Sequence, residues 1–142
     1  METLFEREAF VPAAIPSRRV WAGRVLSGVA VAFLSFDAFA KLIKAAPVIA
    51  ATLELGYPES TIVPIGVLLA IGVVLYAIPK TSLLGAIYLT GYLGGAIATH
   101  VRVGSPLATH TLFPVYVATL VWGGLALRNP RLLPFLLGRQ PE

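Results

Sequence analysis

The residues best suited to chemistry in this 142-residue chain are an aspartate and the lysines that follow it. Asp37 stands near the end of a largely apolar stretch, and Lys41 and Lys44 follow it at spacings that share one helix face. An acid placed before a base on such a face forms a favourable ion pair. A charge within a membrane span costs roughly 2.5–3.5 kcal/mol, so Asp37 is a candidate proton acceptor or ligand anchor. A purely structural ion pair with Lys41 explains the same spacing, and both interpretations stay open.

The second candidate group is His110, which comes early in the last apolar stretch and four residues before Pro114. A proline inside a helix leaves the carbonyl four residues earlier without its donor, and here that carbonyl belongs to His110. We therefore predict a kinked helix with a polar-lined upper half. The His110 imidazole could relay protons or form a hydrogen bond to a quinone-type ligand. A histidine satisfied by a neighbouring threonine or tyrosine is the alternative.

The third apolar stretch has small residues at four-residue spacing. Gly91, Gly95 and Ala98 form a smooth face on which another helix could pack, within the bundle or in a second copy of the chain. At 100° per residue Arg102 shares this face, so we predict that Arg102 points into the bundle. Tyr88 and Tyr92 fall on its flank.

The opposite face of the same stretch carries large apolar residues. Leu89, Leu93 and Ile97 are predicted to face lipid, and His100 projects with them. His100 is therefore set aside as an interfacial, solvated histidine. The two histidines and the one intramembrane acid lie on three different helices and are a weak set of metal ligands, so no metal site is predicted.

The elements that must position these residues are membrane helices. Hydrophobic residues make up 57% of the chain and charged residues 13%. Three stretches, 62–78, 81–101 and 103–127, contain no formal charge and are long enough to span a bilayer. A fourth, 25–36, reaches that length if its flanks are included. Because the apolar runs do not alternate with polar residues, we predict an all-α, four-helix transmembrane bundle rather than a β-barrel.

The expected organisation is a single membrane domain over residues 20–128, with a cytoplasmic or interfacial tail at 1–19 and a cytoplasmic tail at 129–142. Its spans are predicted at about 20–40, 62–78, 81–101 and 107–127. Between the first two spans, Pro47 suits a first helical turn, 48–55 is amphipathic and Gly56 is a natural stop. We therefore expect a short interfacial helix there. Turns are predicted at Pro79-Lys80 and at 104–106.

The basic residues predict the orientation. Eight of the eleven lysines and arginines fall on the side of the two termini and the turn at Lys80. Positive charge favours the cytoplasmic side, so both termini are predicted to be cytoplasmic. The acidic, mixed start of the chain is unlike a cleavable signal peptide, and the first span is expected to be retained. The net charge of +4 is assigned to membrane lipid rather than to nucleic acid, because no basic stripe or stacking platform is present.

Several strings of residues resemble one family. The sequence Leu-Gly-Tyr-Pro-Glu at 55–59 and the sequence Thr-Gly-Tyr-Leu-Gly-Gly-Ala-Ile-Ala-Thr-His-Val-Arg at 90–102 are similar to DoxX-like membrane proteins, as are 113–116 and 122–125. The resemblance implies a small four-helix protein of the bacterial inner membrane, associated with quinone-linked respiration, sulfur oxidation or oxidative-stress complexes. It supplies no catalytic residue set, so catalytic residues stay unknown.

These observations lead to three functional hypotheses. The first is a redox-linked accessory subunit that binds a quinone or similar lipophilic molecule in the outer half of the bundle. There Asp37 and His110 would exchange protons or hydrogen bonds with the ligand. The other expected contacts are two cations that balance negative charge and two tyrosines beside the ring, namely Lys41, Arg102, Tyr88 and Tyr92.

The first hypothesis needs a membrane oxidoreductase as partner. The chain contains no cysteine and no flavin or metal signature, so no intrinsic cofactor is predicted and thiol chemistry is excluded. The second hypothesis is an assembly factor or structural subunit without chemistry. The third is an enzyme or carrier for a small lipophilic substrate, with Asp37 as its acid or base.

Overall fold

The computed structural model describes residues 17–138, which form helices and contain no strand. The elements in chain order are α1 (Ser17–Leu42), α2 (Ala46–Glu54), a 3-10 turn η1 (Glu59–Thr61), α3 (Ile62–Ala77), α4 (Ser82–Arg102), a π-helical turn η2 (Leu107–Thr111), α5 (Phe113–Arg128) and α6 (Leu132–Leu136). Four segments are long and apolar enough to cross a membrane: α1, η1–α3, α4 and η2–α5. The predicted all-α bundle of four membrane helices is thereby confirmed.

The predicted tails are only partly described. Residues 1–16 and 139–142 lie outside the described part of the chain, whereas 17–19 form the first turn of α1 and the second tail contains α6. The predicted short helix is present as α2, with Pro47 in its first turn. Gly56 and Gly104 follow α2 and α4 with φ of +78° and +69°, a conformation that glycine adopts without strain.

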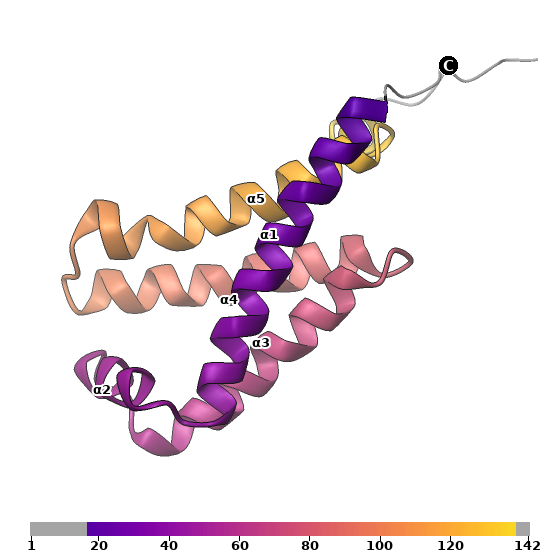
Figure 1. Ribbon diagram of the computed structural model, residues 1–142. Coiled ribbons are helices and arrows are strands. Elements are labelled where there is room, and N and C mark those ends of the chain that lie inside the picture. Colours follow the sequence, from indigo (N-terminus) through magenta and orange to yellow (C-terminus); the bar gives the residue numbers. More distant parts are fainter. Residues whose placement is uncertain (1–16, 139–142) are drawn as a thin grey trace, which may run out of the picture.

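The four long helices form one bundle, in which α1 runs obliquely to α4 (Figure 1). α1 contacts α5 and α3, and α4 contacts α3 and α5, so α1 and α4 are diagonal partners. α1 begins beside the end of α5, and we call this end of the bundle the terminal end. α2 lies at the opposite end, called the α2 end below (Figure 1).

Large apolar side chains cover the outside of the bundle. Phe36 is 72% exposed, Phe39 58% and Val74 58%. A water-exposed surface of this kind would be unfavourable, but it matches the apolar interior of a bilayer. The exterior therefore agrees with four membrane helices.

Small residues bring helices close together in the terminal half. A Cβ on Gly124 of α5 would lie 2.8 Å from Ser27 N of α1, and one on Gly23 would lie 2.9 Å from Arg128 N. Between α3 and α4, a Cβ on Gly85 would overlap backbone atoms of Tyr76. At these three glycines the helix backbones approach as closely as only glycine permits.

The buried face of α4 is not the predicted one. Leu89 and Leu93 are buried in the core, whereas a Cβ on Gly91 or Gly95 would meet nothing within 4 Å. The prediction that the leucines face lipid and the glycines pack within the bundle was therefore wrong. Because lipid is as apolar as a protein core, apolar residues on both faces of a membrane helix do not reveal which face is buried.

The start of the fourth membrane segment also differs from the prediction. Pro114 lies in the first turn of α5, not within a continuous helix, and η2 precedes it. Proline is well tolerated in a first turn, because its nitrogen would have no intrahelical partner there. His110 therefore lies in a π-helical turn rather than above a proline kink. Single π turns are frequent at functional sites.

A buried polar network joins three helices in the terminal half. The Tyr76 hydroxyl of α3 donates to the Val121 carbonyl of α5 at 2.7 Å. The Ser27 hydroxyl of α1 lies 2.8 Å from the same tyrosine oxygen, so it donates to Tyr76. The Arg128 guanidinium lies over the Tyr76 ring, 5.6 Å from its centroid. The hydrogen bonds of the network satisfy the buried Tyr76 and Ser27 hydroxyls, which have no access to water.

We expect Tyr76→Phe to lower the free energy of unfolding by about 1–2 kcal/mol, because it leaves the buried Ser27 hydroxyl without its acceptor. The ring, its packing and its contact with Arg128 are retained. Tyr116→Phe is the matched control, since Tyr116 is 51% exposed, and it should cost less than about 0.5 kcal/mol. Denaturant titration of the detergent-solubilised protein measures both, and equal effects would contradict a structural role of the network.

Candidate functional site

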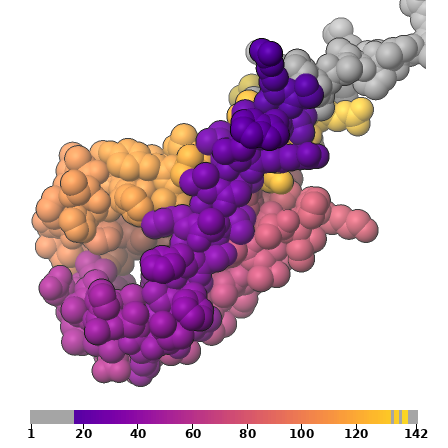
Figure 2. Space-filling view, viewed as in Figure 1, coloured from indigo at the N-terminus to yellow at the C-terminus, as the bar shows by residue number. Residues whose placement is uncertain are grey.

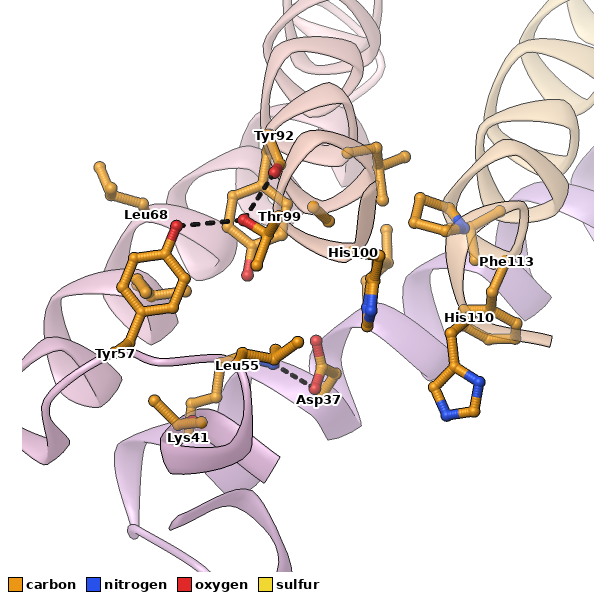
Figure 3. Close-up of a pocket in the computed structure, with 18 of the residues that line it drawn as sticks. Asp37, Lys41, Leu55, Tyr57, Leu68, Tyr92, Thr99, His100, His110 and Phe113 are labelled. Carbon is orange, nitrogen blue, oxygen red and sulfur yellow. Dashed lines mark hydrogen bonds and ion pairs between the residues drawn. The ribbon is translucent and has the colours of Figure 1, made fainter. Parts of the chain in front are cut away.

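A cavity of about 540 Å³ lies in the α2 half of the bundle, and α1, α2, α3, α4, η2 and α5 all contribute to its wall. Its apolar lining includes Phe33, Leu34, Ile62, Ile65, Leu68, Leu93, Phe113 and Val117. Its polar lining includes Asp37, Lys41, Thr52, Tyr57, Tyr92, Thr99, His100, Thr109 and His110 (Figure 3). An apolar cavity with a few converging polar groups is the usual form of a small-molecule site.

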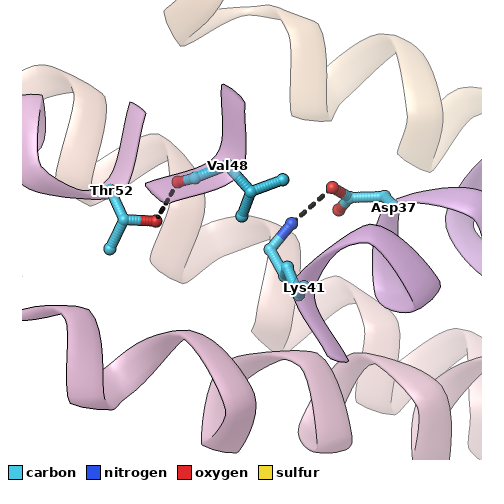
Figure 4. A network of polar contacts seen from close by, with 4 residues as sticks. All are labelled: Asp37, Lys41, Val48 and Thr52. Carbon is cyan, nitrogen blue, oxygen red and sulfur yellow. Dashed lines mark hydrogen bonds and ion pairs between the residues drawn. The ribbon is translucent and has the colours of Figure 1, made fainter. Parts of the chain in front are cut away.

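Asp37 and Lys41 form the charged end of the cavity. The Lys41 ammonium donates to Asp37 Oδ1 from one turn further along α1, as Figure 4 shows. The Lys41 side chain is 18% exposed and that of Asp37 34%. The pair therefore keeps a partly open carboxylate at the cavity wall. Lys44 instead pairs with Glu59 at 3.1 Å, beyond the end of α1.

The residue that anchors α1 beside this pair is Gly66 of α3. A Cβ at Gly66 would lie 2.8 Å from Lys41 Cβ. The close approach of α3 fixes the position of Lys41 and, through the ion pair, that of Asp37. Thr52 of α2 lines the cavity close by, and its hydroxyl donates to the Val48 carbonyl at 2.7 Å (Figure 4).

Two histidines meet on another side of the cavity. The rings of His100 and His110 lie edge to face, with centroids 5.8 Å apart, and both line the cavity (Figure 3). His100 Nδ1 lies 3.0 Å from the Ser105 hydroxyl, and His110 Nδ1 lies 2.8 Å from the Thr109 hydroxyl. Each Nδ1 thus has a hydroxyl partner. The prediction that His100 faces lipid was wrong, because the turn after α4 brings η2 back beside it.

The two predicted tyrosines have different positions. Tyr92 lines the cavity, whereas Tyr88, one turn earlier on α4, is not among the lining residues. Tyr88 instead packs on α3, where a Cβ on Gly72 would lie 2.7 Å from Tyr88 Cδ1. The structure thus places Tyr92 at the site and Tyr88 outside it.

Arg102 is exposed and lies near the site, but it does not line the cavity. Its guanidinium donates to the Leu55 carbonyl and lies 5.6 Å from the centroid of the Tyr57 ring. The Tyr57 hydroxyl in turn lies 3.0 Å from Thr99 Oγ1. Arg102 therefore fastens the loop after α2 to the end of α4.

A smaller hollow of about 340 Å³ adjoins the cavity. It shares Leu55, His100 and His110 with the cavity wall and adds Glu54, Ser105 and Pro106. The two histidines thus stand between the two hollows. Within residues 17–138, no three histidine or carboxylate side chains are grouped as metal ligands.

Several wall residues were missed by the sequence reasoning, notably Tyr57, Phe33 and Phe113. Tyr57 lies in the loop after α2, and no helical periodicity predicts how such a loop folds back. Gly91 and Gly95 also line the cavity, and their missing side chains leave room for it. A contact between copies of the chain through Gly91, Gly95 and Ala98 stays a prediction.

The class of protein that these features define is a small four-helix membrane protein with a partly open cavity at one end. A family model described as the DoxX-like family matches residues 25–124, and the chain belongs to this family. The match extends from the third turn of α1 to the second half of α5 and so includes every residue of the cavity wall. No match was found among curated proteins or among solved structures.

Proposed function

We propose that this protein binds a lipophilic small molecule with a polar, quinone-like ring in the cavity at the α2 end. The observation that carries the proposal is the cavity itself, in which a mainly apolar wall surrounds the Asp37–Lys41 pair and the two histidines. The apolar wall suits a hydrophobic ring. The ammonium, imidazole and tyrosine groups suit hydrogen bonds to its oxygens.

The protein would act as an accessory subunit of a membrane oxidoreductase. Quinone chemistry needs an electron carrier, and the chain has no cysteine for a thiol or iron–sulfur centre. The bound ring would therefore exchange electrons with a partner, while His100, His110 and Asp37 exchange protons with it. We further propose a bacterial inner-membrane location with cytoplasmic termini, on the basis of the positively charged terminal end.

Two tyrosines on one helix give a matched test of this proposal. Tyr92→Phe removes a hydroxyl at the cavity wall, whereas Tyr88→Phe removes one outside it. With decylubiquinone as the probe, we expect Tyr92→Phe to weaken binding about 5- to 10-fold, which corresponds to one lost hydrogen bond. Tyr88→Phe should leave the affinity unchanged. Tryptophan quenching in nanodiscs measures the affinity of each variant.

The two variants also define the contrary result. If the wild-type protein does not bind the quinone, the proposed function is wrong. If both tyrosine variants bind as tightly as wild type, the ring does not occupy the wall beside Tyr92, and the proposed site is wrong.

A further inference from the structure

The cavity is open on the side where α1 and α5 separate. In the terminal half these helices are in backbone contact at Gly23 and Gly124. Towards the α2 end they diverge (Figure 1), and the Phe33 and Phe113 rings meet edge to face across the gap with centroids 5.4 Å apart. Both rings line the cavity, yet they are 40% and 43% exposed. The pair therefore lies at the border between cavity and exterior.

Figure 2 shows a hollow on this face, bounded by α1, by α2 and by the orange segment that begins the fourth membrane helix. The cavity wall includes residues from each of these three borders, such as Asp37, Thr52 and His110. Further large, mainly apolar side chains are exposed on α1 and α5, among them Phe36 at 72% and Tyr116 at 51%. The opening thus lies on the part of the surface that faces lipid.

Contacts close part of the α2 end, beside the smaller hollow that adjoins the cavity there. Two hydrogen bonds fasten the loop after α2 to α4, one from the Arg102 guanidinium to the Leu55 carbonyl and one between the Tyr57 and Thr99 hydroxyls. A third contact joins the Lys44 ammonium to the Glu59 carboxylate, just before α3. All three contacts hold α2 on its α3 and α4 side. The α5 side carries the hollow seen in Figure 2.

We propose that the ligand enters sideways from the bilayer, between α1 and the start of α5, and that it is a tailed amphiphile rather than a compact ring. Its ring lies against Asp37, Tyr92 and the histidines, and its apolar tail leaves past the Phe33–Phe113 pair into lipid. This inference rests on the proposed function and adds the class of ligand and its route. A tail concentrates the ligand in the bilayer beside the opening, and its contact with the two aromatic rings adds to the binding, so the apparent affinity measured from solution rises.

The chain contains no cysteine, which allows a direct test, because a pair of introduced cysteines supplies the only thiols with which a cross-linker can react. In nanodiscs, the double variant Phe33→Cys/Phe113→Cys is joined by a short bifunctional thiosulfonate that a reductant cleaves. The matched control is Leu26→Cys/Gly123→Cys on the same two helices, where a Cβ on Gly123 would lie 3.8 Å from Leu26 Cδ1. The probes are decylubiquinone and the same ring without the decyl chain.

In wild type we expect the tailed probe to bind at least tenfold more tightly than the tailless ring. The cross-link in the Phe33→Cys/Phe113→Cys variant should slow association of the tailed probe at least tenfold, and reductant should restore it. The control cross-link should have no effect. Phe33→Ala, which widens the opening, should speed association without any cross-link.

Two results would overturn the inference in different ways. If wild type binds both probes equally and the cross-link changes neither rate, the lateral route is wrong while the proposed site stands. If wild type binds neither probe, the proposed function fails and the lateral route fails with it.

Discussion

Gly85→Ala is expected to lower the free energy of unfolding by about 3 kcal/mol, a large effect for one methyl group. A Cβ at this position would overlap the backbone of Tyr76 and would lie 2.7 Å from Leu75 C. Backbone atoms cannot turn aside as a flexible side chain can, so α3 and α4 must move apart. The shift would also disturb Tyr76, whose hydroxyl joins three helices.

Gly94→Ala is the matched control for this experiment. Gly94 lies on the same helix, and a Cβ there would meet nothing within 4 Å. It should be neutral or slightly stabilising, because alanine is the better helix former by about 1 kcal/mol. Denaturant titration in detergent measures both variants. If Gly85→Ala were as stable as Gly94→Ala, the close approach of α3 and α4 would be wrong.

Asp37→Asn is expected to have the largest effect at the site. It keeps the shape of the side chain but leaves the Lys41 ammonium, 18% exposed, without its counter-charge. Removing one partner of a fully buried pair costs about 3–5 kcal/mol. Because the Asp37 side chain is 34% exposed, solvent screening should reduce the cost to about 1–2 kcal/mol. Binding of decylubiquinone should weaken at least tenfold, because the unpaired ammonium changes the cavity wall.

A second variant separates the structural role of the pair from its role in binding. Asp37→Asn/Lys41→Met removes both charges, so the stability should return to near the wild-type value. If the pair contacts the ligand, binding stays weak in this stable protein. Recovery of the affinity together with the stability would show that the pair is structural. Unfolding titrations and tryptophan quenching on the same preparations give both quantities.

The elements of the fold could be predicted from the sequence because their signals are local. Uncharged apolar stretches indicate the four spans, and Pro47, Gly56 and Gly104 mark where helices begin or end. The Asp37–Lys41 pair could be predicted for the same reason, since both residues lie one turn apart on one helix. Each of these features depends on a few consecutive residues.

The orientation of α4 could not be predicted in this way. In water the apolar face of a helix is the buried face, but in a bilayer both faces are apolar. Leu89 and Leu93 therefore looked like lipid-facing residues, although they form part of the core. The face of α4 that carries Gly91 and Gly95 borders the cavity instead. A helical wheel cannot distinguish a face that borders a cavity from one that packs on another helix.

The meeting of His100 and His110 depends on the connection between two helices. α4 ends at Arg102, a turn follows at Gly104, and the π-helical turn then carries His110 back beside His100. A wheel drawn for either helix alone places the two imidazoles on unrelated faces. Only the three-dimensional path of the connection brings them together.

The terminal half is tightly packed and the α2 half contains an open cavity, so the two halves differ in how far they can be compressed. Around Gly23, Gly85 and Gly124 the helices touch through their backbones, and little volume remains to be compressed. At the other end about 540 Å³ is empty of protein atoms. We therefore expect lateral pressure from the surrounding bilayer to narrow the cavity, between α1 and α5, more than it changes the terminal half, so the lipid composition around the α2 half should alter the width of the cavity.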